Sequence, residues 1–267
     1  MDVLVTGAHG TVGTAVREQL GGDPAYEFTW MDRQDHPEVE TVVADMRDYP
    51  AMRAACEGQD AVVHLAHDPT VNWQVTDVSW GEVLAADLEG IVTAFGAAVD
   101  AGVEKVVYAS TNHVVGMYEN ERRPEIYDAD DEFVVDHEMP VRPDSMYGVA
   151  KVFGEALARF CSDWYGLRCH CLRIGGVPPG DEPFAWVAPD ADRDAEEYER
   201  AVGHARGVWC SHRDFAQLLA RSLDDETDGF DVFYAVSGNA HRWHDISHAR
   251  EVLGYDPRDD ASEWDLP

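Results

Sequence analysis

The chain has 267 residues, of which 45% are hydrophobic and 27% are charged. This length can bury a substantial core, and we expect one compact unit rather than two independent domains. Fifty-two acidic residues against 20 basic ones give a formal net charge of −32, which disfavours binding to nucleic acid or to acidic membranes. The acidic residues are spread along the whole chain and only Lys105 and Lys151 are lysines, a pattern that predicts adaptation to a high-salt cytoplasm.

The start of the chain resembles a strand and a glycine turn rather than a signal peptide. No apolar run approaches the ~20 residues of a membrane span, so we expect a cytoplasmic protein. The five cysteines lack a metal-ligand spacing, and histidines such as His64, His67 and His241 lack the further ligands of a zinc site. We therefore expect reduced thiols in or near the core and no bound metal.

The chain begins with an apolar run and a glycine-rich turn, which predict a strand, a tight turn and the start of a helix. Gly7 and Gly10 let the backbone approach a pyrophosphate, and Gly13 lets the helix pack against the strand. A second apolar run ends at Asp32, about twenty residues after the glycines, where a carboxylate would bind an adenosine ribose and repel the 2′-phosphate of NADP. The pattern predicts a dinucleotide site that prefers NAD, a preference that the adjoining Arg33 could soften.

Apolar runs then alternate with helical patterns, which predicts an α/β protein with a Rossmann-type doubly wound parallel sheet and a small C-terminal substrate lobe. We expect residues 1–174 to form mainly the dinucleotide-binding sheet and residues 175–267 mainly the substrate lobe. Acidic, proline-containing segments at 116–144 and 175–210 are expected to be loop-rich and to contact substrate. After the first strand, the expected strands cover residues 26–31, 40–45, 61–65, 103–109, 168–174 and 230–236, and the expected helices cover 48–56, 80–101, 146–165, 211–223 and 246–253.

The carboxyl ends of these strands should meet at one edge of the sheet, where open α/β sheets bind ligands. The residues at these ends are Gly7, Asp32, Asp45, Ala66 and Ser110. From this edge Asp45 either bonds to adenine or caps the following helix, and the sequence leaves both interpretations open.

Tyr147 and Lys151 lie four residues apart, on one face of an expected helix. A phenol with an ordinary pKa of about 10 is a poor base near neutrality, but a neighbouring ammonium group and an oxidised nicotinamide both favour the phenolate. Ser110 and Thr111 follow the fifth strand, where a hydroxyl would reach the same reacting oxygen. The constellation predicts removal of a proton from a substrate hydroxyl.

These motifs resemble those of the extended short-chain dehydrogenase/reductase family, the NAD-dependent epimerase/dehydratase family, over nearly the whole chain. The resemblance rests on the turn Thr6–Gly13, on Asp32, on the segment Ala109–Asn112 and on the Tyr147-x-x-x-Lys151 pair. Within the family the chain is similar to uronate dehydrogenases and to NAD-dependent glucose-6-phosphate dehydrogenases of halophilic archaea. The segments that carry this similarity are Ser110–Gly116, Arg142–Gly148, Leu172–Gly175, Trp209–Asp214 and Leu253–Pro257.

The resemblance implies that Tyr147 is the general base, that Lys151 holds the nicotinamide ribose and lowers the pKa of the tyrosine, and that Thr111 fills the position of the family's serine. Asp87 stands where relatives usually carry asparagine. The residues expected at the cofactor are Gly7, His9, Gly10, Thr11, Val12, Gly13, Asp32, Arg33, Asp45, Met46, Leu65, Ala66, His67, Asp87, Ala109, Tyr147, Lys151 and Ile174. Those expected at the substrate are Thr111, Asn112, His113, Gly176, Arg200 and Arg206.

The two arginines in this set are candidates for an anion clamp. Relatives that bind uronates place an arginine five residues before the tryptophan that matches Trp209, and this chain has His204 there. Arg200 and Arg206 flank that position, and the sequence leaves open which of them clamps an anion. Trp186 and Trp209 either stack on a sugar face or pack in the interior.

The expected function is NAD-dependent oxidation at C1 of an aldohexose to its lactone, with glucose-6-phosphate or a uronate as first choice and an uncharged aldose as second. The alternatives are a nucleotide-sugar epimerase or dehydratase of the same family and a non-catalytic dinucleotide-binding sensor. A dehydratase usually follows its serine or threonine with an Asp-Glu pair, whereas Asn112 and His113 follow Thr111 here. The intact tyrosine and lysine pair disfavours a sensor. The family resemblance also implies a homo-oligomer that pairs the helices at 80–101 and 146–165.

Overall fold

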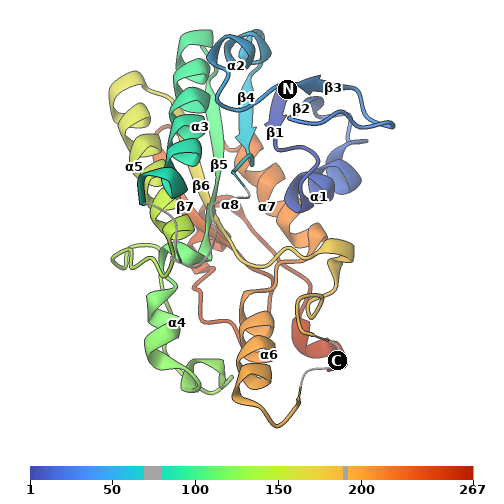
Figure 1. Ribbon diagram of the computed structural model, residues 1–267, viewed down its shortest axis with the longest axis vertical. Helices are drawn as coiled ribbons and strands as arrows, with labels where there is room; N and C mark the ends of the chain where they lie inside the picture. Colours follow the sequence, from blue (N-terminus) through green and yellow to red (C-terminus); the bar gives the residue numbers. More distant parts are fainter. Residues whose placement is uncertain (69–79, 189–191, 267) are drawn as a thin grey trace.

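The computed structural model describes residues 1–68, 80–188 and 192–266. Within these residues, seven parallel strands form one sheet in the order β3-β2-β1-β4-β5-β6-β7, with helices on both faces (Figure 1). The strands are β1 (Asp2–Thr6), β2 (Glu27–Asp32), β3 (Thr41–Val43), β4 (Ala61–His64), β5 (Lys105–Thr111), β6 (Arg168–Ile174) and β7 (Phe230–Ala235). The helices are α1 (Thr11–Leu20), α2 (Tyr49–Cys56), α3 (Trp80–Ala101), α4 (Met117–Arg122), α5 (Met146–Tyr165), α6 (Glu196–Val208), α7 (His212–Asp224) and α8 (Ser247–Leu253).

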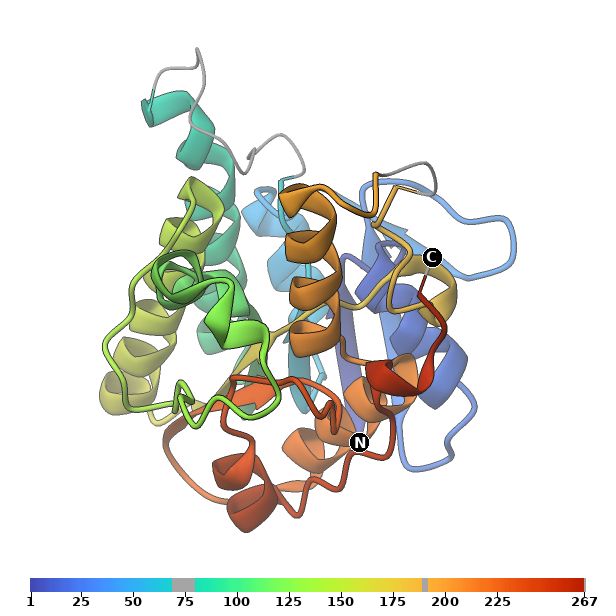
Figure 2. The ribbon, with the colours of Figure 1, turned by 90° about the horizontal axis from the view of Figure 1, so that it is seen from below.

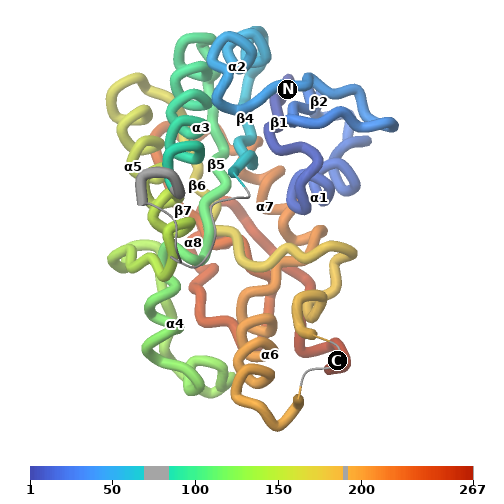
Figure 3. Tube along the Cα trace, viewed as in Figure 1, coloured from blue at the N-terminus to red at the C-terminus, as the bar shows by residue number. Residues whose placement is uncertain are grey.

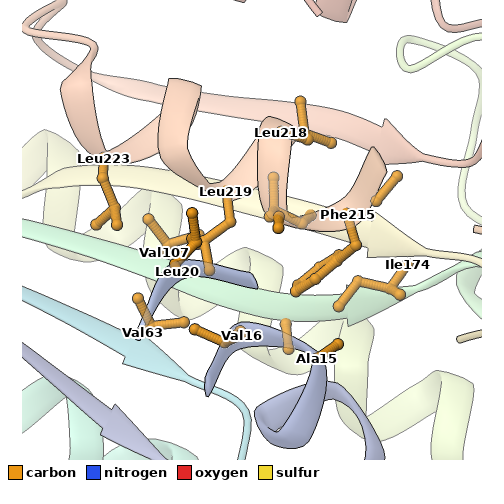
Figure 4. Packing of buried hydrophobic residues seen from close by; sticks show 14 of the residues in the cluster. Ala15, Val16, Leu20, Val63, Val107, Ile174, Phe215, Leu218, Leu219 and Leu223 are labelled. Carbon is orange, nitrogen blue, oxygen red and sulfur yellow. The ribbon is translucent and has the colours of Figure 1, made fainter. Parts of the chain in front are cut away.

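Successive side chains of each strand point to opposite faces of the sheet and pack into two separate hydrophobic cores. Val3 and Val5 of β1 pack with side chains of α1, α7 and α8, a cluster seen from close by in Figure 4. Leu4, between them, faces the opposite side and packs with α2, α3 and α5. Because helices cover both faces, the strands are nearly continuous apolar runs. All five cysteines are buried as free thiols, as predicted for the core.

The strand order places a switch of direction beside β1. From β1 the chain adds β2 and β3 on one side and then crosses to add β4 on the other, where Thr6 pairs with His64. Ligands of doubly wound sheets bind at such a switch point, beyond the carboxyl ends of the strands. The predicted Rossmann-type parallel sheet is confirmed, and with it the edge at which the site should lie.

Two helices occur where the sequence predicted loops, and this prediction was wrong at α4 and α6. Helix α6 carries Glu196, Glu197 and Glu199 in its first turn, where carboxylates stabilise the positive end of the helix dipole. It buries Tyr198 and Val202. Seen from below, both helices lie in front of the carboxyl edge of the sheet (Figure 2). Residues 189–191 of the same predicted loop lie outside the described residues.

The part below the carboxyl edge has two small cores of its own. One includes Val114, Ile126 and Trp243, and the other includes Phe184 and Val202. Residues from the middle and the end of the chain therefore share this part, whereas β7, α7 and α8 belong to the sheet layers. The segment Ala261–Glu263, near the end of the chain, returns to lie beside α6 (Figure 3). No helix in the described part of the chain is both long and apolar enough to cross a membrane.

Lys105 is buried at the start of β5 and binds the end of a helix on the next layer. Its Nζ donates hydrogen bonds of 2.8 Å to the carbonyl oxygens of Ser222 and Leu223, at the C-terminus of α7. A cation at this end stabilises the negative pole of the helix and satisfies carbonyls that have no partner within it. This lysine therefore has a structural role.

Candidate active site

The glycine turn after β1 brings the start of α1 to the carboxyl edge. Gly7 has φ +70°, and a Cβ there would lie 2.7 Å from the backbone nitrogen of Ala66. A Cβ on Gly13 would lie 2.5 Å from the carbonyl oxygen of Gly7, so this glycine lets α1 pack on the turn. At Gly10, the N-cap of α1, no side chain of the described residues caps the helix. The first N–H groups of α1 thus remain available to a pyrophosphate.

A cavity of about 290 Å³ lies on the β2 side of the glycine turn. In its wall, the Asp32 carboxylate accepts a 3.0 Å hydrogen bond from the backbone N–H of His9, which ties the turn to the end of β2. This first cavity is lined by Thr6, Gly7, His9, Gly10, Met31, Asp32, Arg33, Gln34, Ala44, Asp45, Met46, Arg47, Leu65, Ala66, His67 and Asp68.

Asp45 lines this first cavity and is paired with Arg47. The guanidinium donates to both carboxylate oxygens, at 2.9 and 2.8 Å. These hydrogen bonds lower the pKa of Asp45 to about 2, so the group is a carboxylate at neutral pH. The alternative prediction that Asp45 caps the next helix was wrong, because Asp48 is the N-cap of α2 and accepts the N–H of Ala51.

A second cavity of about 560 Å³ lies on the other side of the glycine turn. Both cavities share Gly7, Gly10, Leu65 and His67, so they form one groove that bends around the turn. The second is lined by Gly7, Gly10, Thr11, Val12, Gly13, Leu65, His67, Ala109, Ser110, Thr111, Asn112, His113, Tyr147, Lys151, Ile174, Gly175, Gly176, Val177, Trp186 and His204. Two compartments joined at uncapped helical N–H groups fit a dinucleotide, with an adenosine at Asp32 and a nicotinamide near Tyr147.

Thr111, Tyr147 and Lys151 meet in the second compartment. Thr111 ends β5, and its side chain is hydrogen-bonded to that of Tyr147 in the first turn of α5. Ser145 fixes this turn, because its Oγ accepts a 3.1 Å hydrogen bond from the N–H of Gly148. The Nζ of Lys151 lies 5.5 Å from the centre of the Tyr147 ring. Ser110, next to Thr111 on the strand, points to the opposite side and donates to Glu155.

Burial dominates the titration of this group. It lowers the pKa of Lys151 to about 8, against the opposing effect of the Asp87 carboxylate. Burial and Asp87 both raise the pKa of Tyr147, and only the hydrogen bond with Thr111 lowers it. In the chain alone Tyr147 is therefore a phenol at neutral pH. The effect of Lys151 and an oxidised nicotinamide on Tyr147 stays a prediction for the cofactor-bound enzyme.

Asp87 lies on α3 behind this group and lines neither cavity. Its side chain is 1% exposed, and its Oδ1 accepts a hydrogen bond of 2.5 Å from the backbone N–H of Asp68. Its Oδ2 is buried without a hydrogen-bond partner among the described residues. The negative charge is thus held close to Tyr147 and Lys151 without being neutralised by a direct contact.

Two histidines form the far end of the second compartment, each with its own carboxylate. The Nδ1 of His113 lies 2.8 Å from Asp144, and the Nδ1 of His204 lies 2.8 Å from Glu119. Tyr127 donates a further hydrogen bond of 2.7 Å to Glu119. The centre of the His113 ring lies 6.2 Å from that of Tyr147 and 6.3 Å from that of His204. The rings of Tyr147, His113 and His204 thus follow one another toward α6.

All but three of the residues predicted for the site line one of the two compartments; the three are Asp87, Arg200 and Arg206. His204 faces the cavity, and Arg206 follows it by two residues, about 200° further around the helix. Arg200 lies one turn earlier and is exposed. Neither arginine lines a compartment, although the charge of Arg200 acts on Tyr127, the hydrogen-bond partner of Glu119.

The sequence placed His204 where uronate-binding relatives carry an arginine but predicted no role for it, and it did not single out Glu119 or Asp144. The acidic first turn of α6, followed by apolar residues at helical spacing, was a signal for the helix that carries His204. No local pattern links Glu119 to His204, because 85 residues separate the partners. Of the two tryptophans left open, Trp186 lines the cavity, whereas Trp209 is buried and contacts Trp264.

The fold and the site define a dinucleotide-binding enzyme with a Tyr/Lys pair on one helix. The model of the NAD dependent epimerase/dehydratase family matches residues 3–177, so the chain belongs to this family. The match confirms the predicted family and NAD as its cofactor.

Two curated relatives come from Haloferax volcanii. An NAD-dependent glucose-6-phosphate dehydrogenase is 35% identical over 98% of this chain and 95% of its own length. An L-arabinose 1-dehydrogenase (NAD(P)+) is 34% identical over 97% of both chains. Among solved structures, a mutant uronate dehydrogenase of Agrobacterium tumefaciens complexed with NAD is 28% identical, with a TM-score of 0.73 over 98% of this chain and 86% of that one. These relatives agree with the prediction of an oxidoreductase that acts on a sugar hydroxyl.

Proposed function

We propose that this chain is an NAD-dependent sugar dehydrogenase that oxidises C1 of an aldose to the lactone. The observation that carries the proposal is the hydrogen-bonded pair of Thr111 and Tyr147 at the far side of the groove, with Lys151 buried beside it. Relatives that span nearly the whole chain are dehydrogenases of glucose-6-phosphate and L-arabinose, which supports a sugar as substrate.

The groove contains the groups that a dinucleotide needs. The uncapped start of α1 would hold the pyrophosphate, Asp32 the adenosine ribose and Lys151 the nicotinamide ribose. Bound NAD supplies the hydride acceptor for the carbon that is oxidised.

The residues of the chain handle the proton of the reacting hydroxyl. Thr111 would donate to or accept from the C1 hydroxyl and hold it beside the Tyr147 oxygen. As the C1 hydroxyl is oxidised, Tyr147 would take its proton, and the ammonium group of Lys151 would stabilise the phenolate from which this transfer starts. Asn112 and His113, at the same strand end, would bind neighbouring sugar hydroxyls.

A homo-oligomer is part of the same proposal. Helix α5 exposes apolar side chains at helical spacing, among them Phe153, Phe160 and Trp164, which are 37%, 50% and 74% exposed. Val92 on the neighbouring α3 is 50% exposed. A stripe of this kind favours pairing with a second copy. A mass measurement by light scattering in molar KCl should give a multiple of the 29.7 kDa chain.

The function is tested with a panel of free, phosphorylated and uronic sugars in molar KCl, by following NADH absorbance and identifying the product by NMR. We expect net NADH formation that matches lactone formed, and its loss in a Tyr147→Phe variant. Sugar isomerisation or dehydration without net NADH would instead establish an epimerase or dehydratase. No turnover of any sugar by a folded, NAD-binding chain would contradict the proposal.

A further inference from the structure

The substrate end of the groove has a charge pattern that limits which sugars it can take. Beyond the Thr111 and Tyr147 hydroxyls, the walls are formed by His113, His204 and the ring of Trp186. A smaller cavity of about 120 Å³ continues past His204 between apolar side chains of residues 183–209. A sugar whose C1 lies at Tyr147 must direct its far end toward these groups.

The imidazoles of His113 and His204 do not give the substrate end of the groove a net positive charge, because each faces a carboxylate. Glu119 is 8% exposed, and burial by itself raises its pKa. The charge of His204 and the hydrogen bonds from His204 and Tyr127 outweigh burial and lower this pKa to about 2. Glu119 and Asp144 are the carboxylates that face the two histidines. If both imidazoles are protonated the four groups sum to zero, and if both are neutral they sum to about two negative charges.

No arginine of the described residues lines this end of the groove, although the charges of Arg123 and Arg200 act on Tyr127 from outside it. Among the residues that the structure describes, the one lysine or arginine that lines the second compartment is Lys151, which lies at Tyr147 rather than at the far end. Arg200 and Arg206 line neither this compartment nor the smaller cavity. The segments outside the described residues, 69–79 and 189–191, contain no lysine or arginine in the sequence.

We propose that the enzyme selects an uncharged aldose over its phosphorylated or uronic counterpart, with His204 and its partner Glu119 as the specificity-determining pair. This inference rests on the proposed dehydrogenase function and replaces the expected anion clamp. Imidazole nitrogens exchange hydrogen bonds with sugar hydroxyls, and Trp186 offers an aromatic face to the C–H groups of the ring. A phosphate or carboxylate would instead meet the two imidazoles with the carboxylates of Glu119 and Asp144 directly behind them, and repulsion between like charges disfavours the anionic sugar.

The test compares sugars that differ only in the charge at the far end: glucose with glucose-6-phosphate and glucuronate, and galactose with galacturonate. In each set we expect kcat/KM for the neutral sugar to exceed that for the anion by about tenfold or more. The same order is expected for binding to the Tyr147→Phe variant loaded with NAD, measured by calorimetry. Turnover with a preference for the anionic sugars would overturn this inference and leave the dehydrogenase function intact.

Two variants examine the pair directly. Glu119→Gln removes the charge and keeps an amide oxygen for Tyr127 and His204, so the ratio of anionic to neutral kcat/KM should rise by about tenfold. Adding His204→Arg should raise the ratio further. Glu199→Gln removes an exposed carboxylate of the same helix outside the groove and is the matched control, with no change in the ratio. A ratio that stays constant in folded Glu119→Gln and in the double variant would refute the role of the pair.

Varying the salt concentration distinguishes this local effect of Glu119 from a general repulsion of anionic sugars by the net charge of −32. Screening reduces the Debye length to about 3 Å at 1 M salt, so a preference caused by the whole molecule should vanish as KCl increases. A preference caused by the buried carboxylate of Glu119 behind His204 should persist, because buried charges are screened much less. Loss of the discrimination between 1 M and 3 M KCl would therefore count against the inference.

Discussion

In the proposed mechanism, Tyr147 and Thr111 divide the proton chemistry of the site between a phenol and an alcohol. Tyr147→Phe removes the base and keeps the ring, so kcat should fall by ~10² to 10⁴, while the dissociation constant of NAD changes little. Thr111→Ser should leave kcat nearly unchanged, whereas Thr111→Ala should lower kcat, because the hydroxyl of this residue is the group that bonds to Tyr147. Steady-state NADH formation and calorimetric titration with NAD measure these effects. Near-normal turnover by Tyr147→Phe would place the base elsewhere.

Asp87 acts on the same group through charge. Its carboxylate raises the pKa of both Tyr147 and Lys151, so Asp87→Asn should lower both values. The base must be deprotonated to act, and a lower pKa extends its active form to lower pH. We expect the acid limb of the kcat/KM profile to move to lower pH.

Asparagine keeps the oxygen that accepts the N–H of Asp68, so the variant should fold as the parent does. An Asp87→Ala variant, which lacks that acceptor, gives the comparison for lost hydrogen bonding. An acid limb that moves to higher pH in Asp87→Asn would contradict the electrostatic role.

The sequence identified the residues whose relation is local. Tyr147 and Lys151 share a helix, and Thr111 ends a strand with a clear apolar pattern, so each could be assigned from spacing. His204 and Glu119 could not be paired in this way, since they come from helices in two segments that both look like acidic loops. Their contact depends on how the lower part of the molecule packs, which no local pattern records.

At the scale of elements, the packing of α1 on the glycine turn separates two effects of adding a methyl group. A Cβ on Gly13 would lie 2.5 and 2.6 Å from carbonyl oxygens of Gly7 and Ala8, so Gly13→Ala should lower the melting temperature by several degrees. A Cβ on Gly10 would meet only the Gly7 oxygen, at 3.4 Å, and would extend into the groove. Gly10→Ala should melt near the parent temperature and bind NAD about tenfold more weakly or worse.

Differential scanning calorimetry and titration with NAD distinguish the two variants, and each serves as the control for the other. Equal losses of stability in both would mean that the turn tolerates no side chain anywhere. Unchanged NAD affinity in Gly10→Ala would show that the pyrophosphate lies away from the start of α1.

The same scale explains which elements the sequence predicted. The strands and the helices that cover the sheet alternate in long apolar segments, and their expected positions agree with the structure within a few residues. Helices α4 and α6 are rich in charged residues and bury narrow faces against the small lower cores. Their helical state depends on that packing as well as on local propensity.

At the scale of the molecule, the net charge of −32 opposes the compact state when salt is low. Raising KCl from about 0.1 M to about 2 M shortens the Debye length from about 10 Å to below about 3 Å and relieves this repulsion. We expect the melting temperature to rise over this range. Sodium sulfate and sucrose controls distinguish charge screening from general exclusion of solutes. A melting temperature that does not change with KCl would show that the acidic surface imposes no such requirement.

The position of the two lysines determines how the native protein responds to amine-directed chemistry. Lys105 is 3% exposed at the end of α7 and Lys151 is 2% exposed behind Tyr147. In the folded chain both lysine amines are therefore protected, and acylation or crosslinking through lysine will find little to react with. Unfolding releases both side chains at once, one from the end of α7 and one from its buried place beside Tyr147. The number of acyl groups that a chain acquires thus reports on loss of the fold and of the site together.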